Sequence, residues 1–224
     1  MSDRKSTLLK TFIQLGNTQP AALPPVFQRD DVRYAPALVE TFLTEYTRPG
    51  DVVFDPFAGF GTTLVVAEAM GRRPLGLEYD PTRVDYIRSL LRDPSAIRHG
   101  DARRLGDYAF PPLDFSMTSP PYMNRDDAED PLAAYLVPGQ GYAAYLEGLH
   151  DIYAQLAGLL KPGARAVVEV ANLKTNGTVT PLAWDVARAL APALTFEGEV
   201  VVGWDHYGYG YDHSYCLVFV KMRS

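Results

Sequence analysis

Short apolar runs alternate along the chain with longer segments in which apolar residues recur every three or four positions. The short runs predict strands, and the helical spacing predicts helices. The predicted strands cover residues 52–54, 73–80, 96–100, 113–118 and 164–171. The predicted helices cover residues 34–46, 62–70, 81–92, 142–160 and 180–190. Alternation of this kind is typical of an α/β protein with a largely parallel sheet.

The two ends of the chain differ from this pattern. Residues 1–30 carry polar residues and the run Pro20-Ala-Ala-Leu-Pro-Pro25, which predicts an irregular arm. We therefore divide the chain into an N-terminal arm, 1–32, and one domain, 33–224. Residues 194–204 and 214–222 predict two strands joined by an aromatic, glycine-rich hairpin. Residues 123–141 form a polar loop of the length that functional lids have.

The stretch from Val52 to Met70 predicts a ligand-binding turn between a strand and a helix. Its apolar run leads into Asp55-Pro56, two glycines follow at 59 and 61, and a helix begins near Thr62. The glycines let the backbone approach a ligand closely, and the first N–H groups of the helix point into the same crevice. Open α/β sheets bind nucleotides at such crevices. A dinucleotide fold would require a third glycine at the position of Leu64.

Carboxylates follow the next two predicted strands. Glu78 ends the second strand about 20 residues beyond the glycine loop, where an acidic side chain can accept both hydroxyls of a ribose. The alternative for Glu78 is an exposed carboxylate without a ligand. Asp101 follows the third strand, and its alternative to ligand binding is a helix N-cap or Asx turn.

Two motifs together carry a family resemblance. Asp55-Pro-Phe-Ala-Gly-Phe-Gly-Thr-Thr63 resembles the S-adenosylmethionine-binding motif of the amino-group DNA methyltransferases, and Thr118-Ser-Pro-Pro-Tyr122 resembles their catalytic motif. The resemblance implies cofactor binding by Tyr34, Asp55, Pro56, Phe57, Ala58, Gly59, Gly61, Thr62, Thr63, Glu78 and Asp101. It implies catalytic roles for Ser119, Pro120, Pro121 and Tyr122. Arg33, Tyr34 and Pro36 are candidates for a lid over the methionine end, or belong to an ordinary packing helix.

The resemblance also implies a fold and an activity. The fold would be a three-layer Rossmann-like methyltransferase with a mostly parallel seven-stranded sheet, closed by an antiparallel C-terminal hairpin. The activity would be methylation of an exocyclic amine in DNA, in some members within restriction–modification. Serine at the first catalytic position favours cytosine-N4 over adenine-N6. The alternatives are a guanine-N2 methyltransferase acting on RNA and a non-catalytic cofactor-binding subunit.

The catalytic motif suits the chemistry of an exocyclic amine, whose lone pair is delocalised into the ring. The Ser119 side chain and the Pro120 carbonyl can accept the two amine hydrogens and direct the lone pair at the methyl group. Tyr122 would stack on a base swung out of its helix. Asn172 and Lys174 either line the base pocket or form a polar turn. Tyr207, Tyr209 and Tyr211 either stack on nucleic acid or pack at a hairpin tip.

Composition restricts the partners and excludes other chemistry. Net charge is −6 and the pI is about 5.2, whereas duplex binders usually show a basic face. Because the 123–141 loop has no room for extended base readout, a partner subunit that supplies target recognition is compatible with the chain. The sole cysteine, Cys216, lies in an apolar strand pattern, which argues against a thiolate nucleophile. The four histidines lack metal-ligand spacing. We expect no membrane span and a cytoplasmic location.

Overall fold

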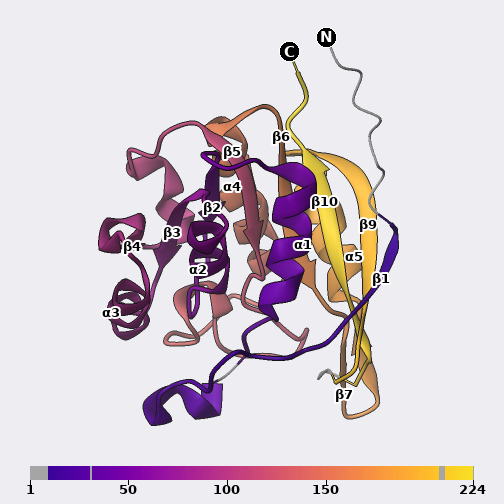
Figure 1. Ribbon diagram of the computed structural model, residues 1–224. Coiled ribbons are helices and arrows are strands. Elements are labelled where there is room, and N and C mark those ends of the chain that lie inside the picture. The colour runs from indigo at the N-terminus through magenta and orange to yellow at the C-terminus, as the bar shows by residue number, and fades with distance from the viewer. Residues whose placement is uncertain (1–9, 31, 207–209, 224) are drawn as a thin grey trace.

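The computed structural model describes residues 10–30, 32–206 and 210–223, and a large sheet forms its centre (Figure 1). Within these residues the sheet has eight strands in the order β1-β9-β10-β6-β5-β2-β3-β4. The strands are β1 (Phe12–Leu15), β2 (Val52–Asp55), β3 (Arg73–Glu78), β4 (Ile97–His99), β5 (Leu113–Thr118), β6 (Leu160–Val170), β9 (Thr195–Trp204) and β10 (His213–Val220). Strands β2 to β6 are parallel, and β10 pairs antiparallel with both β6 and β9. The predicted α/β fold with its antiparallel hairpin is confirmed.

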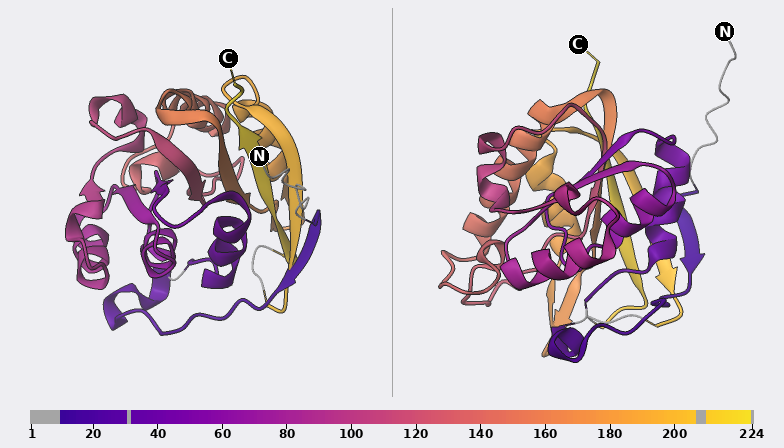
Figure 2. Two further views of the ribbon diagram at one scale, coloured as in Figure 1. Left: turned by 45° about the horizontal axis from the view of Figure 1, so that its top comes forward. Right: turned by 60° about the vertical axis from the view of Figure 1, so that its left-hand side comes forward.

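Helices cover both faces of the sheet, as the left-hand view in Figure 2 shows. On one face lie α1 (Pro36–Tyr46), α2 (Thr62–Ala69) and α3 (Pro81–Leu90), and on the other lie α4 (Tyr142–Leu159) and α5 (Leu182–Leu190). The predicted three layers are therefore present. In the described part of the chain, no helix is long and apolar enough to cross a membrane.

The central strand β2 shows why these strands appear as continuous apolar runs in the sequence. Successive side chains of a strand point to opposite faces. Val53 packs with α1 and α2, whereas Val52 and Phe54 pack with the cluster that contains α4 and α5. All three residues are at most 5% exposed. Both faces of this strand are covered, as is usual for parallel sheets.

The N-terminal arm corrects one expectation. Residues 12–15 form a strand that pairs parallel with β9, so the irregular arm predicted there is wrong, and the sheet gains one strand over the predicted seven. Phe12 and Gln14 are more exposed than Ile13 and Leu15. Four residues with one partly buried face are too few to give a clear periodic signal in a polar segment.

The hairpin after β6 explains the polar turn that the sequence predicts. Here β7 (Leu173–Thr175) and β8 (Thr178–Thr180) pair antiparallel around Asn176-Gly177. Both turn residues have positive φ, 50° and 79°, as a two-residue type I′ turn requires. The hairpin hangs below the carboxyl ends of the parallel strands, at the foot of the molecule in Figure 1.

Candidate active site

A cleft of about 730 Å³ opens at the carboxyl ends of the parallel strands. It lies where the strand order reverses between β2 and β5, the place at which open α/β sheets bind ligands. We call its two parts the cofactor half and the target half. The cofactor half is lined by Tyr34, Pro56, Phe57, Ala58, Gly59, Phe60, Thr62, Glu78, Tyr79, Arg83, Gly100 and Ala102. The target half is lined by Asn17, Ser119, Pro120, Pro121, Tyr122, Asn124, Tyr135, Glu169, Leu173 and Trp204.

The loop after β2 follows its glycines. Gly59 and Gly61 have φ of 57° and 84°, a region that side chains other than glycine rarely adopt. Gly61 is also the N-cap of α2, and a Cβ there would lie 3.0 Å from the Ile87 side chain. Of the predicted loop residues, Gly61 and Thr63 support the turn from beneath, while Pro56 to Gly59 and Thr62 face the cleft.

Asp55 lies under this loop and is not among the residues that line the cleft. It is 1% exposed, and its Oδ1 accepts a hydrogen bond from the Phe57 amide at 3.0 Å. Burial raises the pKa of this carboxyl to about 6, against hydrogen bonds that favour the charged form. Asp55 therefore shapes the loop through the backbone.

Glu78 does face the cleft, as predicted. Its Oε2 accepts from the Gly59 amide at 2.7 Å and its Oε1 from the Asp80 amide at 2.9 Å. Burial raises the pKa of its carboxyl. Each carboxylate oxygen has two lone pairs, so Glu78 can hold the glycine loop in place and still accept from hydroxyl groups of a ligand.

Asp101 is placed differently. Its carboxylate accepts from the Arg103 amide at 2.9 Å, as the N-cap of a short 3-10 helix, and forms an ion pair with the Arg103 guanidinium at 2.7 Å. Gly100 and Ala102 line the cleft, but Asp101 does not. The alternative of a local cap is confirmed, and cofactor binding by Asp101 stays a prediction.

Tyr34 reaches the cleft from the segment before α1. Its hydroxyl contacts Thr63 Oγ1 and lies 3.4 Å from Asp55 Oδ2. Burial, followed by the charge of Asp55, raises the pKa of this phenol well above its usual value. Arg33 also lines the cleft, while Pro36 begins α1 and does not. Two of the three lid candidates therefore line the cleft, and their role as a lid stays a prediction.

All four residues of the catalytic motif line the target half, directly after β5. The carbonyls of Pro121 and Tyr122 accept hydrogen bonds from the Tyr145 and Tyr135 hydroxyls, at 2.9 and 2.7 Å. These bonds fix the backbone beyond Pro120. The loop and the catalytic motif, more than fifty residues apart in sequence, therefore meet in one cleft.

Comparison with known proteins identifies the cofactor half. A family model described as DNA methylase, covering amino-group N6 and N4 methyltransferases, matches residues 31–89. The Type II methyltransferase M.MjaII of Methanocaldococcus jannaschii is 43% identical over 49 residues, 22% of this chain and 9% of that protein. The DNA adenine methyltransferase YhdJ of Escherichia coli is 39% identical over 69 residues, 31% of this chain and 22% of that protein. The resemblance to the amino-group DNA methyltransferases is confirmed.

The matches with this family are local, and the chain spans only a small part of the length of these curated relatives. Similarity in fold covers more of the chain than these sequence matches do. The structure of TrmN from Thermus thermophilus superposes with a TM-score of 0.59 at 23% identity, covering 84% of this chain and 49% of that one. This likeness shows the Rossmann-like fold of S-adenosylmethionine-dependent methyltransferases. The family match ends at residue 89, before the catalytic motif.

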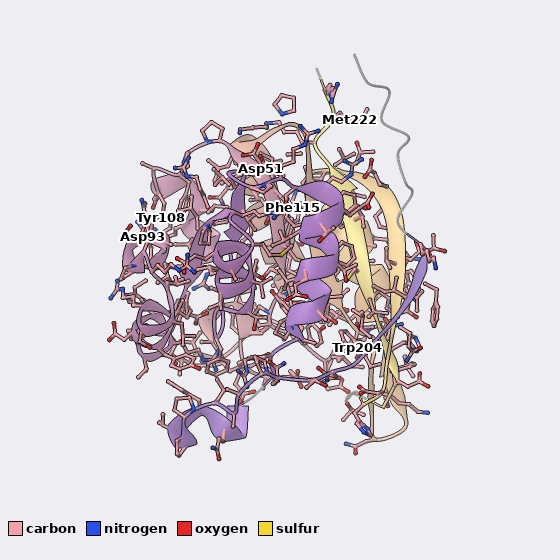
Figure 3. The ribbon with its side chains drawn as sticks, viewed as in Figure 1. Asp51, Asp93, Tyr108, Phe115, Trp204 and Met222 are labelled. Atoms are coloured by element: carbon pink, nitrogen blue, oxygen red, sulfur yellow. The ribbon has the colours of Figure 1, made fainter. Side chains whose placement is uncertain are left out.

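Several residues of the target half escaped the sequence analysis, Glu169, Trp204 and Leu173 among them. Glu169, on β6, is 2% exposed and accepts a hydrogen bond from the Tyr122 hydroxyl at 2.9 Å. Trp204, at the end of β9 (Figure 3), is 4% exposed, and its Nε1 donates to Ser214 Oγ at 2.9 Å. Leu173 begins β7. The available signal was a lone glutamate in the otherwise apolar run Ala166–Val170, because such a charge is costly to bury unless it has partners.

The remaining candidates that the structure describes do not line the cleft. Asn172 Oδ1 accepts from the Ala183 amide at 3.0 Å and so holds the start of α5, and neither Asn172 nor Lys174 lines the cleft. Cys216 is fully buried in β10, and burial raises the pKa of its thiol well above the usual value. The prediction that it belongs to the core is confirmed. Tyr211 makes an edge contact with His213, and Tyr207 and Tyr209 lie outside the described residues. Within those residues no cluster of metal-ligating side chains is present.

Proposed function

We propose that the protein is an S-adenosylmethionine-dependent methyltransferase that methylates an exocyclic amine of a nucleobase, with cytosine-N4 in DNA as the favoured acceptor. One observation carries this proposal: a single cleft joins the glycine loop of an amino-methyltransferase segment to Ser119-Pro-Pro-Tyr122. Its volume of about 730 Å³ is within the usual range for cofactor sites, about 300–1,000 Å³.

The residues of the cofactor half suit S-adenosylmethionine. Glu78 can accept from the ribose hydroxyls, and Tyr79 and Phe60 offer apolar surface beside it for the adenine. Tyr34, whose hydroxyl contacts Thr63 in the first turn of α2, and Arg33 also line the cleft and would contact the methionine end. When bound, the cofactor supplies a methyl group on a positively charged sulfur, the electrophile that an amine attacks.

The target half supplies acceptors for the amine. Ser119 and the Pro120 carbonyl would accept its two hydrogens and so direct the nitrogen lone pair at the methyl group, a gain from orientation and fixed dipoles. Apolar and aromatic surface from Tyr122, Leu173 and Trp204 would hold the base. The serine favours cytosine, and the family match favours DNA.

The charge of the chain bears on the form of the substrate. The loop over the target half carries Asp126, Asp127, Glu129 and Asp130, and net charge is −6. A duplex would be repelled by this rim unless a partner subunit supplied basic contacts. We therefore expect better turnover on single-stranded than on duplex DNA for the isolated chain.

The test is methyl transfer from labelled S-adenosylmethionine to plasmid DNA, its heat-denatured strands and total RNA, with mass spectrometry of the released nucleosides. N4-methylcytosine in DNA is the expected product. Label confined to guanine-N2 of RNA would replace the DNA assignment by the RNA alternative. Tight cofactor binding without transfer to any of the three would favour a non-catalytic subunit.

A further inference from the structure

Glu169 is a buried carboxylate that the proposed chemistry does not yet use. It sits near the carboxyl end of β6 and lines the target half of the cleft, with 2% of its surface exposed. On the neighbouring strand it faces Cys216 in the register, a small apolar thiol. Burial of a charged group costs free energy unless hydrogen bonds and charges compensate it. An apolar residue would fill this strand position at less cost, which points to a role in the cleft.

A chain of hydrogen bonds connects Glu169 to the catalytic serine. The Tyr122 hydroxyl donates to Glu169 Oε2 at 2.9 Å, and Ser119 Oγ lies 3.4 Å from the Tyr122 oxygen, with Ser119 as the donor. The second distance is long for two hydroxyl groups, and catalytic hydrogen bonds often shorten only when substrate is bound. These hydrogen bonds connect the end of β5 with the end of β6, two neighbouring strands that come together only when the protein folds.

The direction of this chain follows from the carboxylate. An ionised carboxylate only accepts, whereas each hydroxyl has one proton to donate. Tyr122 therefore donates its hydrogen bond to Glu169 and presents lone pairs to Ser119. Ser119 in turn donates its hydrogen bond to Tyr122, and its lone pairs remain available to accept a hydrogen bond from a donor in the cleft.

This direction matters because the motif begins with serine. An aspartate or asparagine at position 119 would present an acceptor oxygen by its own chemistry. A serine hydroxyl can either donate or accept a hydrogen bond. The exocyclic amine donates hydrogen bonds, so the residue beside it has to be an acceptor. Something beyond Ser119 has to hold the hydroxyl in the accepting orientation.

We propose that Glu169 is a positioning residue of the target half, which acts through Tyr122 to hold Ser119 as an acceptor for the exocyclic amine. The inference rests on the proposed methyl transfer. In this proposal Glu169 does not contact the cofactor. Its loss should therefore lower kcat and leave the affinity for the cofactor unchanged.

A double-mutant cycle tests the route through Tyr122. Glu169→Gln and Tyr122→Phe, which keeps the stacking ring, should each lower kcat at least about tenfold, with the Kd for S-adenosylmethionine within about twofold of wild type. The double variant should be no slower than Tyr122→Phe alone, because under this proposal the carboxylate acts on Ser119 through Tyr122. Multiplied losses would overturn the proposal. Glu147→Gln, on the exposed side of α4, is the matched control and should leave kcat unchanged.

A second cycle asks whether the requirement comes from the serine. In a Ser119→Asn background, which has its own acceptor oxygen, Tyr122→Phe should change kcat less than about twofold. A loss as large as in the serine background would mean that Tyr122 is needed for some other reason, and would overturn the proposal. This pair also carries the test if Glu169→Gln does not fold, as judged by thermal unfolding.

Neutron diffraction of deuterated protein shows the orientation of the Ser119 and Tyr122 hydroxyl groups and needs no activity measurement. Deuterium on Ser119 should point to Tyr122, and deuterium on Tyr122 to Glu169; a Ser119 deuterium in the cleft would overturn the inference. The two levels of proposal fail separately. A wild type that methylates none of the offered nucleic acids ends the proposed function and the inference with it, whereas an active wild type with additive effects ends the inference alone.

Discussion

The cofactor half and the target half of the cleft are built in different ways. Half of the residues listed for the cofactor half come from one continuous segment, the turn between β2 and α2, and the others come from the segment before α1, the end of β3, α3 and the turn after β4. The target half collects residues from the ends of β5, β6 and β9 and from the loops around them. The family match, residues 31–89, covers most of the cofactor half and stops before the target half. Binding of a common cofactor is thus locally encoded, while the acceptor site depends on how distant strands converge.

The largest expected effect comes from the target half. Ser119→Ala removes the side-chain acceptor for the amine, so kcat should fall about 100-fold while the Kd for S-adenosylmethionine stays the same. Single-turnover assays and calorimetry measure the two quantities. Ser89→Ala, at the exposed end of α3, is the matched control. An unchanged rate for Ser119→Ala would remove the serine from the mechanism and leave only the Pro120 carbonyl.

The next effect concerns Asp55 and the stability of the cofactor half. Its pKa is raised to about 6 by burial, against about 4 in an unfolded chain. The folded state therefore binds this proton more tightly, and its contribution to the unfolding free energy is full below about pH 4 and declines as pH rises to about 6. The decline should amount to about 3 kcal/mol.

Asp55→Asn isolates this contribution. The difference in unfolding free energy between wild type and Asp55→Asn, measured by urea denaturation, should fall by that amount between pH 4 and pH 7. Asp151→Asn, exposed on α4, should give a flat difference over the same range. A flat difference for Asp55→Asn too would mean that burial does not raise the pKa of this carboxyl.

A smaller effect is expected at Glu78. Glu78→Gln removes the charge from the hydrogen bond to the Gly59 amide and from the proposed bonds to ribose. A charge-assisted bond contributes about 2 kcal/mol, so the Kd for S-adenosylmethionine should rise about 30-fold, with kcat at saturating cofactor nearly unchanged. Glu40→Gln on α1, also exposed, should bind normally. A loss of kcat without a loss of affinity would mean that Glu78 acts in turnover and not in cofactor binding.

Sequence patterns predicted the elements around the cofactor half well because the signals there are local. The helix predicted at 62–70 is α2, Thr62–Ala69, and the glycine loop and Glu78 line the cleft as expected. The signals failed where a partner far away in sequence decides the structure. The strand at 12–15 exists because β9 offers an edge, and Glu169 matters because Tyr122, 47 residues away, reaches it.

Asp101 gives the smallest expected effect and separates motif resemblance from geometry. The resemblance implies cofactor binding by Asp101, but here both of its carboxylate oxygens bind the Arg103 guanidinium and one also caps the following turn. Asp101→Asn keeps an oxygen for the cap and loses only a partly exposed ion pair, a contribution of at most about 1 kcal/mol. The Kd for S-adenosylmethionine should therefore change less than about twofold, against about 30-fold for Glu78→Gln. Calorimetry with both variants decides whether Asp101 is a local cap or a cofactor ligand. An equal loss of affinity at Asp101 would mean that the carboxylate leaves Arg103 and binds the cofactor. The cofactor half would then take its final form only when the cofactor binds.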